Sequence, residues 1–248
     1  MTPEELHRYS RHILLREIGG QGQQRLRAAS VLVVGAGGLG SSALMYLAAS
    51  GVGRITVMDG DDVELSNLQR QIIHLDGTGL NKAISAAQTL RRLNPNAEVT
   101  PIPRHLAEGD GVTGFDLVLD GSDSFATRYA VNAACVAADV PLISAALTQW
   151  EGQIGVFGDG AACYACVFPQ APAAHLVPTC AEAGVAAPLP GILGTMMAME
   201  AVKHLTGAGQ TLRNRLFIHD ALYADARTIR THRRADCPVC GTVAPPQG

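Results

Sequence analysis

Four of the six cysteines form two Cys-x-x-Cys pairs, Cys163 with Cys166 and Cys237 with Cys240. Each pair has the spacing of a zinc knuckle, and two knuckles supply the four thiolates of a tetrahedral structural zinc site. A redox disulfide is the alternative, but the motif occurs twice and neither copy follows the strand-to-helix pattern of a thioredoxin site. The cysteines therefore predict a structural Zn²⁺ that connects the C-terminal part of the chain to its middle, across a gap of 70 residues.

Three charged residues, Arg70, Lys82 and Asp123, could act on a phosphorylated substrate. Two unit charges about 4 Å apart interact by about 4 kcal/mol at an effective dielectric constant near 20, so a carboxylate that approaches a triphosphate needs compensating cations. Arg70 and Lys82 could instead be solvated charges on two helices, and Asp123 could cap the helix that follows it. The choice between these interpretations depends on the elements that position the three side chains.

The strongest structural pattern lies in residues 31–71. Residues 31–34 are apolar β-formers, and they lead through Gly35-Ala36-Gly37-Gly38-Leu39-Gly40 into a helical pattern at residues 41–50. A second strand, residues 54–59, completes a βαβ unit and places Asp59 19 residues after Gly40, where a ribose hydroxyl needs an acceptor. This arrangement predicts a nucleotide site, and by itself it does not distinguish NAD from ATP.

Strands and helices alternate through the next part of the chain. We expect strands near residue 99 and at residues 116–120 and 141–147, with helices at residues 65–74, 81–93 and 125–138. This alternation predicts an α/β fold with a Rossmann-like, doubly wound and mainly parallel sheet. Because ligands of such sheets bind at the carboxyl ends of the strands, Asp123 should lie near the glycine turn.

The remaining segments are shorter. β-like runs at residues 154–157, 216–218 and 228–231 surround a buried helix at residues 191–205, and they predict antiparallel strands that continue the same sheet. An amphipathic helix at residues 3–16, a loop at residues 19–22 and a short helix ending at residue 28 precede the first strand. No linker rich in Pro, Gly or charge is present. We therefore expect one domain over residues 1–248, with N-terminal helices (1–28), a nucleotide-binding part (29–150) and a zinc-carrying part (151–248).

Composition narrows the class of protein. With 47% hydrophobic and 17% charged residues, the 248-residue chain suits a sizeable buried core, and its net charge of −3 argues against nonspecific nucleic-acid binding. Residues 1–16 lack the apolar core of a signal peptide, and the most apolar stretch, residues 183–199, is too short to span a bilayer comfortably. Cys-x-x-Cys pairs suit metal binding in a reducing compartment, so we expect a cytoplasmic protein without a membrane partner.

Taken together, the motifs resemble the ThiF/MoeB/HesA group of ubiquitin-activating-enzyme-like adenylyltransferases. The resemblance runs almost from end to end, and it includes both Cys-x-x-Cys pairs and the segment from Cys180 to Val185. The other motifs that match the family are the glycine turn, Arg8-Tyr9-Ser10-Arg11, Asp59-x-Asp61-x-Val63, Ser66-Asn67-Leu68-x-Arg70-Gln71, Lys82 and Asp116-Leu-Val-Leu-Asp120-x-x-Asp123.

The resemblance implies a reaction. ATP would adenylate the C-terminal glycine carboxylate of a ubiquitin-like sulfur-carrier protein ending in Gly-Gly, giving an acyl-adenylate and pyrophosphate in a pathway of the thiamine or molybdopterin type. It further implies a carrier-binding role for residues 151–248, a homodimer and a separate sulfur donor. Activation of a small-molecule or RNA carboxylate remains an alternative. A nucleotide-sensing module is another, and an NAD-dependent dehydrogenase is less favoured because no convincing hydride-handling acid/base pair is present.

The resemblance also implies roles for individual residues around ATP and Mg²⁺. Asp59 would bind the ribose, Asn67, Arg70 and Lys82 the phosphates, and Asp123 the Mg²⁺. Arg11 would reach the partner subunit's site. Cys180, in a loop at residues 168–190 that we expect to be mobile, would act covalently as in some members of the family. Other members do not need this cysteine, and a small buried thiol is the alternative interpretation. The family usually has Asn at the position of Ser124. The complete expected nucleotide site is Gly35, Gly37, Gly38, Gly40, Asp59, Asp61, Ser66, Asn67, Leu68, Gln69, Arg70, Lys82, Asp123 and Ser124.

Two further residues have structural interpretations. Cys135 lies among Ala and Val on the expected helix after Asp123, and we predict that it packs in the core. The eight histidines show no paired metal-ligand spacing, and His74 is of interest only because it lies near Arg70.

Overall fold

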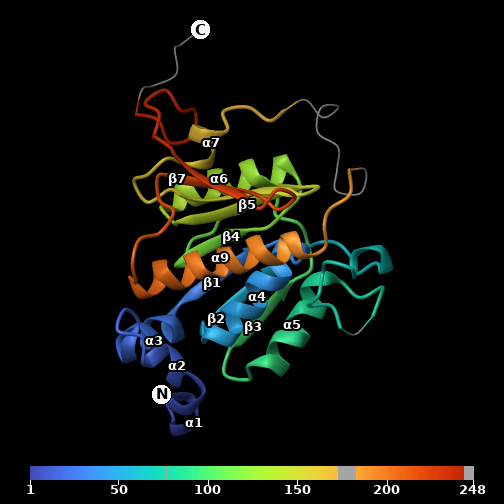
Figure 1. Ribbon diagram of the computed structural model, residues 1–248, viewed down its shortest axis with the longest axis vertical. Helices are drawn as coiled ribbons and strands as arrows, with labels where there is room; N and C mark the ends of the chain where they lie inside the picture. The colour runs from blue at the N-terminus through green and yellow to red at the C-terminus, as the bar shows by residue number, and fades with distance from the viewer. Residues whose placement is uncertain (76, 173–182, 243–248) are drawn as a thin grey trace.

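The computed structural model describes residues 1–75, 77–172 and 183–242 (Figure 1). Eight strands form one sheet in the order β3-β2-β1-β4-β5-β6-β7-β8. The first five positions are parallel and the last three strands join antiparallel, so the predicted mixed sheet is confirmed. The strands are β1 (Ser30–Val34), β2 (Arg54–Met58), β3 (Glu98–Ile102), β4 (Leu117–Asp120), β5 (Leu142–Thr148), β6 (Glu151–Phe157), β7 (Arg215–Asp220) and β8 (Asp225–Arg230).

Helices cover both faces of the sheet. Alternate residues of a strand point to opposite faces, and in β1 Val31 and Val33 join one core while Leu32 and Val34 join the other. The first core receives α3 (Gly19–Ala28), α4 (Gly38–Ser50), α5 (Lys82–Leu93) and α9 (Pro188–Thr206), and the second receives α6 (Phe125–Ala138). Burial on both faces explains why β1 is apolar at nearly every position.

Helix α9 crosses α4 at very close range, and the two lie side by side in Figure 1. A Cβ at Gly194 would overlap the carbonyl oxygen of Leu39 and the Oγ of Ser42, so this crossing requires glycine. The Ser42 hydroxyl also donates to the Pro190 carbonyl oxygen at 3.2 Å. The crossing thereby fixes Pro190 beside Gly38, at the start of α4.

Two N-terminal expectations are wrong. The expected helix at residues 3–16 is broken into α1 (Pro3–Arg8) and α2 (Ser10–Ile13) by Tyr9, which is buried and accepts a hydrogen bond from Asn94 Nδ2 at 2.8 Å. The loop expected at residues 19–22 instead belongs to α3, because Gly22 packs closely against Ile18 and Thr206. In both places a tertiary contact overrides the local sequence pattern.

The helix expected at residues 65–74 is reduced to one short 3₁₀ helix, η1 (Leu65–Asn67), followed by turns. The carbonyl oxygen of Ile73 accepts from Thr89 Oγ1 at 2.8 Å, and His74 enters the core. These side-chain contacts replace the helical hydrogen bonds that the segment would otherwise form.

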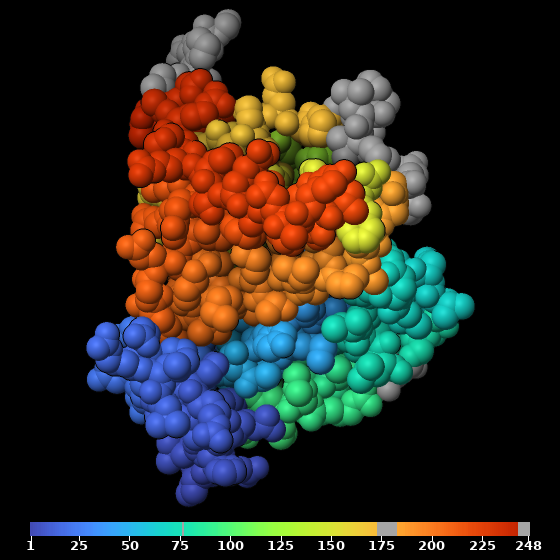
Figure 2. Space-filling model, in the orientation of Figure 1, coloured from blue at the N-terminus to red at the C-terminus, as the bar shows by residue number. Residues whose placement is uncertain are grey.

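The edge strand β8 is exposed at all six positions, and among the described strands it pairs only with β7. In the space-filling view the N-terminal helices form a lobe at the lower left, and the segment at residues 65–75 protrudes on the right (Figure 2). Within the described ranges, no helix combines the length and the apolar character needed to cross a bilayer.

Candidate functional site

A hollow of about 190 Å³ opens at the carboxyl ends of β1, β2 and β4. This is the edge at which parallel α/β sheets bind ligands, as the strand order predicted. The walls come from the glycine turn, the end of β2, the first turn of α6 and the start of α9. The lining includes Gly35, Gly37, Gly38, Asp59, Asp61, Arg70, Gln71, Lys82, His105, Leu106, Ser122, Asp123, Ser124, Thr127, Arg128, Leu147 and Pro190.

The glycine turn is held from both sides. The Ala36 N–H donates to Asp59 Oδ2 at 2.7 Å, and the Ala36 carbonyl oxygen accepts from His74 Nε2 at 2.9 Å. His74 Nδ1 is then the acceptor of the Ser85 hydroxyl at 3.0 Å. Burial lowers the pKa of His74, in keeping with this neutral tautomer. The turn therefore presents its N–H groups and the N-terminus of α4 to the hollow in a fixed conformation, which suits a phosphate group.

Asp59 lies in the hollow and has a structural role that the sequence did not reveal. Its Oδ1 accepts from the Asp61 N–H at 2.9 Å, while Oδ2 holds Ala36. Each carboxylate oxygen has a second acceptor position, so the expected contact with a ribose hydroxyl stays compatible with these two bonds.

The two expected phosphate-binding cations both line the hollow. Lys82 is 6% exposed, and its Nζ lies 2.8 Å from Asp61 Oδ2. Arg70 donates from Nη2 to Asn67 Oδ1 at 2.9 Å. The Lys82 ammonium group has two further donors besides the one that contacts Asp61, and Asn67 holds Arg70 in place.

The alternative role of Asp123 as a helix cap does not apply. Ser124 caps α6, because its Oγ accepts from the Thr127 N–H at 3.4 Å. Asp123 is exposed and lines the hollow, and among the described residues its side chain makes no hydrogen bond or ion pair. An unpaired carboxylate at this position is a suitable oxygen ligand for Mg²⁺.

Other expected residues lie elsewhere. Ser66, Asn67, Leu68 and Gln69 do not line the hollow, and Ser66 Oγ and Asn67 Nδ2 instead contact Glu64 at 3.3 and 3.4 Å. Gly40 lies behind the turn. Arg11 is exposed on α2, outside the lining. Cys180 and much of the loop expected to be mobile, at residues 168–190, lie outside the described residues.

The lining residues that were absent from the expected site include Gln71, His105, Thr127 and Arg128. His105 reaches the hollow from the segment after β3 and pairs with Asp61 at 3.3 Å. Gln71 directly follows Arg70 in the motif that resembles the family, so its place in the site could have been predicted from the sequence. The helical spacing of Thr127 and Arg128 from Asp123 was a weaker one.

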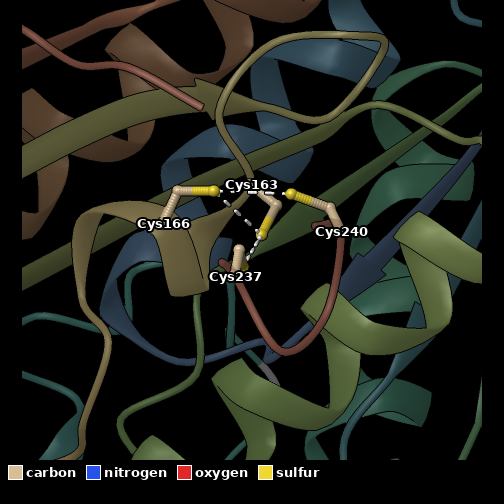
Figure 3. Close-up of side chains that lie close together, drawn as sticks. All are labelled: Cys163, Cys166, Cys237 and Cys240. Carbon is tan, nitrogen blue, oxygen red and sulfur yellow. Dashed lines mark hydrogen bonds between the residues drawn. The ribbon is translucent and has the colours of Figure 1, made fainter. Parts of the chain in front are cut away.

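The four cysteines come together as predicted (Figure 3). The Sγ atom of Cys163 lies 3.8 Å from the Sγ of Cys166 and 3.6 Å from the Sγ of Cys237. The Sγ of Cys166 lies 3.4 Å from the Sγ of Cys240. Sulfurs bound tetrahedrally to zinc at about 2.3 Å are about 3.8 Å apart, so the cluster fits the ion. Cys163 is the N-cap of α7 (Tyr164–Val167) and Cys166 lies within this helix, where its Sγ accepts from the Arg234 N–H at 3.4 Å. A zinc ion held here would use all four thiolates, which would leave no open coordination position for catalysis.

Replacement of Cys240 with Ser should lower the zinc content and the thermal stability together. Structural zinc contributes roughly 10–16 kcal/mol of binding energy in small zinc-finger peptides, so we expect a large drop in melting temperature. Zinc per protomer and the melting temperature are the measurements, with the nearby exposed substitution Thr242→Ser as the control. Loss of activity with both quantities unchanged would contradict a structural role.

Cys135 is 2% exposed within the α6 core, and burial raises the pKa of its thiol to about 12. It is thus a packing residue, as predicted.

A parallel sheet with a glycine turn, a strand-end carboxylate and a helix N-terminus at one edge defines a Rossmann-like nucleotide-binding protein. The cations and the Cys₄ cluster distinguish it from a simple dinucleotide-binding domain. The sequence profile of the ThiF family matches residues 9–239. The chain belongs to the ThiF family.

Individual relatives are similar over nearly the whole chain. The sulfur carrier protein adenylyltransferase of Thermus thermophilus is 45% identical over 250 residues, covering 97% of this chain and 92% of the relative. The molybdopterin-synthase adenylyltransferase of Escherichia coli K12 is 43% identical over 247 residues, covering 97% and 98%. Among solved structures, E. coli MccB with ATP matches with a TM-score of 0.79 and 25% identity, over 94% of this chain and 73% of that one.

Proposed function

We propose that the protein is an ATP-dependent adenylyltransferase acting on the C-terminal glycine carboxylate of a small ubiquitin-like sulfur-carrier protein. The carboxylate oxygen attacks the α-phosphorus of ATP, the bond to the leaving pyrophosphate breaks, and an acyl-adenylate forms. The observation that carries the proposal is the single hollow that joins the glycine turn, the cations Arg70 and Lys82 and the unpaired carboxylate Asp123. The names of both curated relatives, each an adenylyltransferase, support it.

Alignment and charge neutralisation provide the catalysis in this proposal, and no side chain is the nucleophile. The glycine turn and the α4 N-terminus hold the nucleotide phosphates, Asp59 holds the ribose, and Arg70 and Lys82 neutralise phosphate charge. Asp123 holds Mg²⁺, which supplies further neutralisation at the phosphates when it is bound. The attacking carboxylate can then approach an otherwise repulsive triphosphate.

The carrier would dock on residues 151–248. The pairing of β5 through β8 places the turn between β7 and β8 at the same end of the sheet as the hollow. This turn exposes Leu222 and Tyr223, at 53% and 79% of their surface. Exposed apolar side chains of this kind are typical of protein docking surfaces. A separate protein would donate the sulfur, and any covalent step at Cys180 would follow carbonyl activation, in a reducing compartment such as the cytoplasm.

The direct test mixes the protein with ATP, Mg²⁺ and a candidate carrier ending in Gly-Gly and detects the AMP adduct by intact-mass spectrometry. The matched control is the same carrier without its two terminal glycines. We expect the adduct with the first carrier alone. An AMP adduct on a small carboxylic acid or RNA instead would favour the alternative substrates, and no adduct on any carboxylate despite ATP binding would favour a nucleotide sensor.

The position of Arg11 supports a homodimer with shared sites. Helix α2 packs against α3, which leads directly into the amino end of β1, whereas the hollow lies at the carboxyl end of that strand. The N-terminal lobe and the segment that carries Arg70 accordingly lie on opposite sides in Figure 2. Arg11 of one protomer is thus remote from its own site, and we propose that it contacts phosphate in the partner's site.

Mixing an inactive Arg11→Ala protein with an inactive Asp123→Ala protein should restore part of the activity. A hybrid dimer would combine Arg11 from one protomer with Asp123 from the other and so contain one complete site. Pyrophosphate exchange is measured before and after subunit exchange, and each variant mixed with wild-type protein provides the control. If proven hybrids recover nothing, Arg11 acts within its own chain or not at all.

A further inference from the structure

Arg128 is a buried cation at the wall of the nucleotide hollow. It lies on the first turns of α6, is 7% exposed and lines the hollow with Asp123 and Thr127. Its Nη2 donates to the Ser122 carbonyl oxygen at 3.1 Å, and its guanidinium carbon lies 5.0 Å from the centre of the Phe125 ring. Its Nε is buried and has no hydrogen-bond partner among the described residues. Such a cation has unused donors, and desolvation without a partner is costly.

Neutralisation of a nearby acid does not account for these unused donors. Asp120, at the end of β4, is fully buried, and its carboxylate accepts from the Ser122 N–H and hydroxyl and from the Ser144 hydroxyl at 3.0, 2.6 and 2.9 Å. No ion pair within 4 Å joins Asp120 to Arg128 in the described part of the chain. Burial raises the pKa of Asp120 while the charge of Arg128 opposes that rise, so the two groups interact through space but the guanidinium fork remains available.

Tyr164, the residue that follows the proposed zinc ligand Cys163, packs against α6 on the turns next to Arg128. The Tyr164 N–H donates to Asn132 Oδ1 at 2.7 Å, and Asn132 lies one helical turn after Arg128 on α6. The Tyr164 ring packs edge-on against Tyr129 at 5.4 Å. Helix α6 thus connects the segment that carries Cys163 with the wall of the nucleotide hollow.

We propose that Arg128 is a further binding residue of the nucleotide site, and that Tyr164 positions its guanidinium from the zinc knuckle. The ligand is an oxyanion, either of the nucleotide or of the approaching carboxylate. The proposal rests on the proposed function for the identity of that carboxylate, but ATP binding is measurable without any carrier. If no carrier is found, the effect of Arg128 on ATP binding can still be measured.

The first comparison separates the charge of Arg128 from its fork. Arg128→Gln removes both, whereas Arg128→Lys keeps the charge that Asp120 senses. We expect Arg128→Gln to raise either the dissociation constant of ATP or the KM of the carrier by about tenfold or more, because hydrogen bonds to charged groups are strong. Arg128→Lys should raise the same constant by a smaller factor. A change in the dissociation constant of ATP identifies the nucleotide as the source of the oxyanion, and a change confined to the KM of the carrier identifies the carboxylate. Wild-type constants in folded Arg128→Lys and Arg128→Gln would overturn the proposal.

The second comparison tests positioning. Tyr164→Phe removes only a hydroxyl group, and Tyr129→Phe is its matched control, since the Tyr129 hydroxyl in the same aromatic cluster donates to the Phe168 carbonyl oxygen at 2.8 Å. We expect Tyr164→Phe to raise the same constant as the Arg128 variants by about threefold to tenfold, with unchanged zinc content and melting temperature, and Tyr129→Phe to leave it unchanged.

A double variant completes the test and does not depend on whether Arg128→Gln folds. If Tyr164 acts through Arg128, adding Tyr164→Phe to Arg128→Lys should cost less than the two separate effects combined. Fully additive effects, or an unchanged constant in Tyr164→Phe, would overturn the positioning role. Equal effects of Tyr164→Phe and Tyr129→Phe would overturn it too, because they would indicate a general loss of packing.

Discussion

Asp123→Ala should abolish carrier-dependent ATP–pyrophosphate exchange. Without the metal that Asp123 is proposed to hold, the attacking carboxylate meets uncompensated phosphate charge. By the Coulomb estimate this costs several kcal/mol, and each 1.4 kcal/mol of barrier is about a tenfold change in rate, so we expect a loss of more than about a hundredfold. The structure strengthens the expectation, because Ser124 rather than Asp123 caps α6.

The matched control is Glu98→Ala, which removes an exposed carboxylate from the start of β3, at the opposite end of the sheet. It should retain the exchange rate. Melting temperature and ATP affinity distinguish a catalytic loss from misfolding. Exchange at the wild-type rate in Asp123→Ala would remove this carboxylate from the mechanism.

Gly40→Ala should unfold or severely destabilise the protein and prevent nucleotide binding. A Cβ at Gly40 would overlap the carbonyl oxygen of Gly35, a backbone atom in a turn that Asp59 and His74 hold in place. Gly35 itself has φ 91°, so the turn is already in a conformation that favours glycine. Overpacking of this kind costs about 3 kcal/mol or more, which lowers the melting temperature by roughly 6–12 °C in a chain of this size.

Gly20→Ala provides the comparison for Gly40→Ala. Gly20 also lies in a helix, α3, but no atom lies within 4 Å of a Cβ added there. Because Ala is a better helix former than Gly by up to about 1 kcal/mol, this variant should be neutral or slightly more stable. A Gly40→Ala protein that melts and binds ATP like Gly20→Ala would show that the turn can relax.

The sequence predicted those parts of the site whose positions follow from local order along the chain. The glycine turn and Asp59 terminate successive parallel strands, so the topology of a βαβ unit brings them together. Asp123 follows β4 in the same way. The four cysteines were predictable because metal-ligand spacing is a short-range signal, even though the pairs are distant from each other.

The parts that sequence did not predict depend on contacts between distant segments. His105 lines the hollow because the segment after β3 packs against Gly60, which follows β2. Arg128 lines it because α6 packs against the sheet through the second core. Tyr9 breaks the first helix because Asn94, far along the chain, binds its hydroxyl. The residues 66–69 looked equivalent to Arg70 in the motif, yet only Arg70 of residues 66–70 lines the hollow.

The exposed edge strand β8 bears on how the protein behaves at high concentration. The unpaired backbone N–H and C=O groups of an edge strand are a template for edge-to-edge pairing of sheets between molecules. Here Arg227 and Arg230 outnumber Asp225 on that strand, so two such edges carry the same net charge and repel each other. Since this repulsion acts between solvent-exposed charges, salt weakens it, and the screening length falls from about 10 Å at 0.1 M to about 3 Å at 1 M. We therefore expect edge-to-edge polymerisation to be slowest in dilute buffer and to increase in concentrated salt.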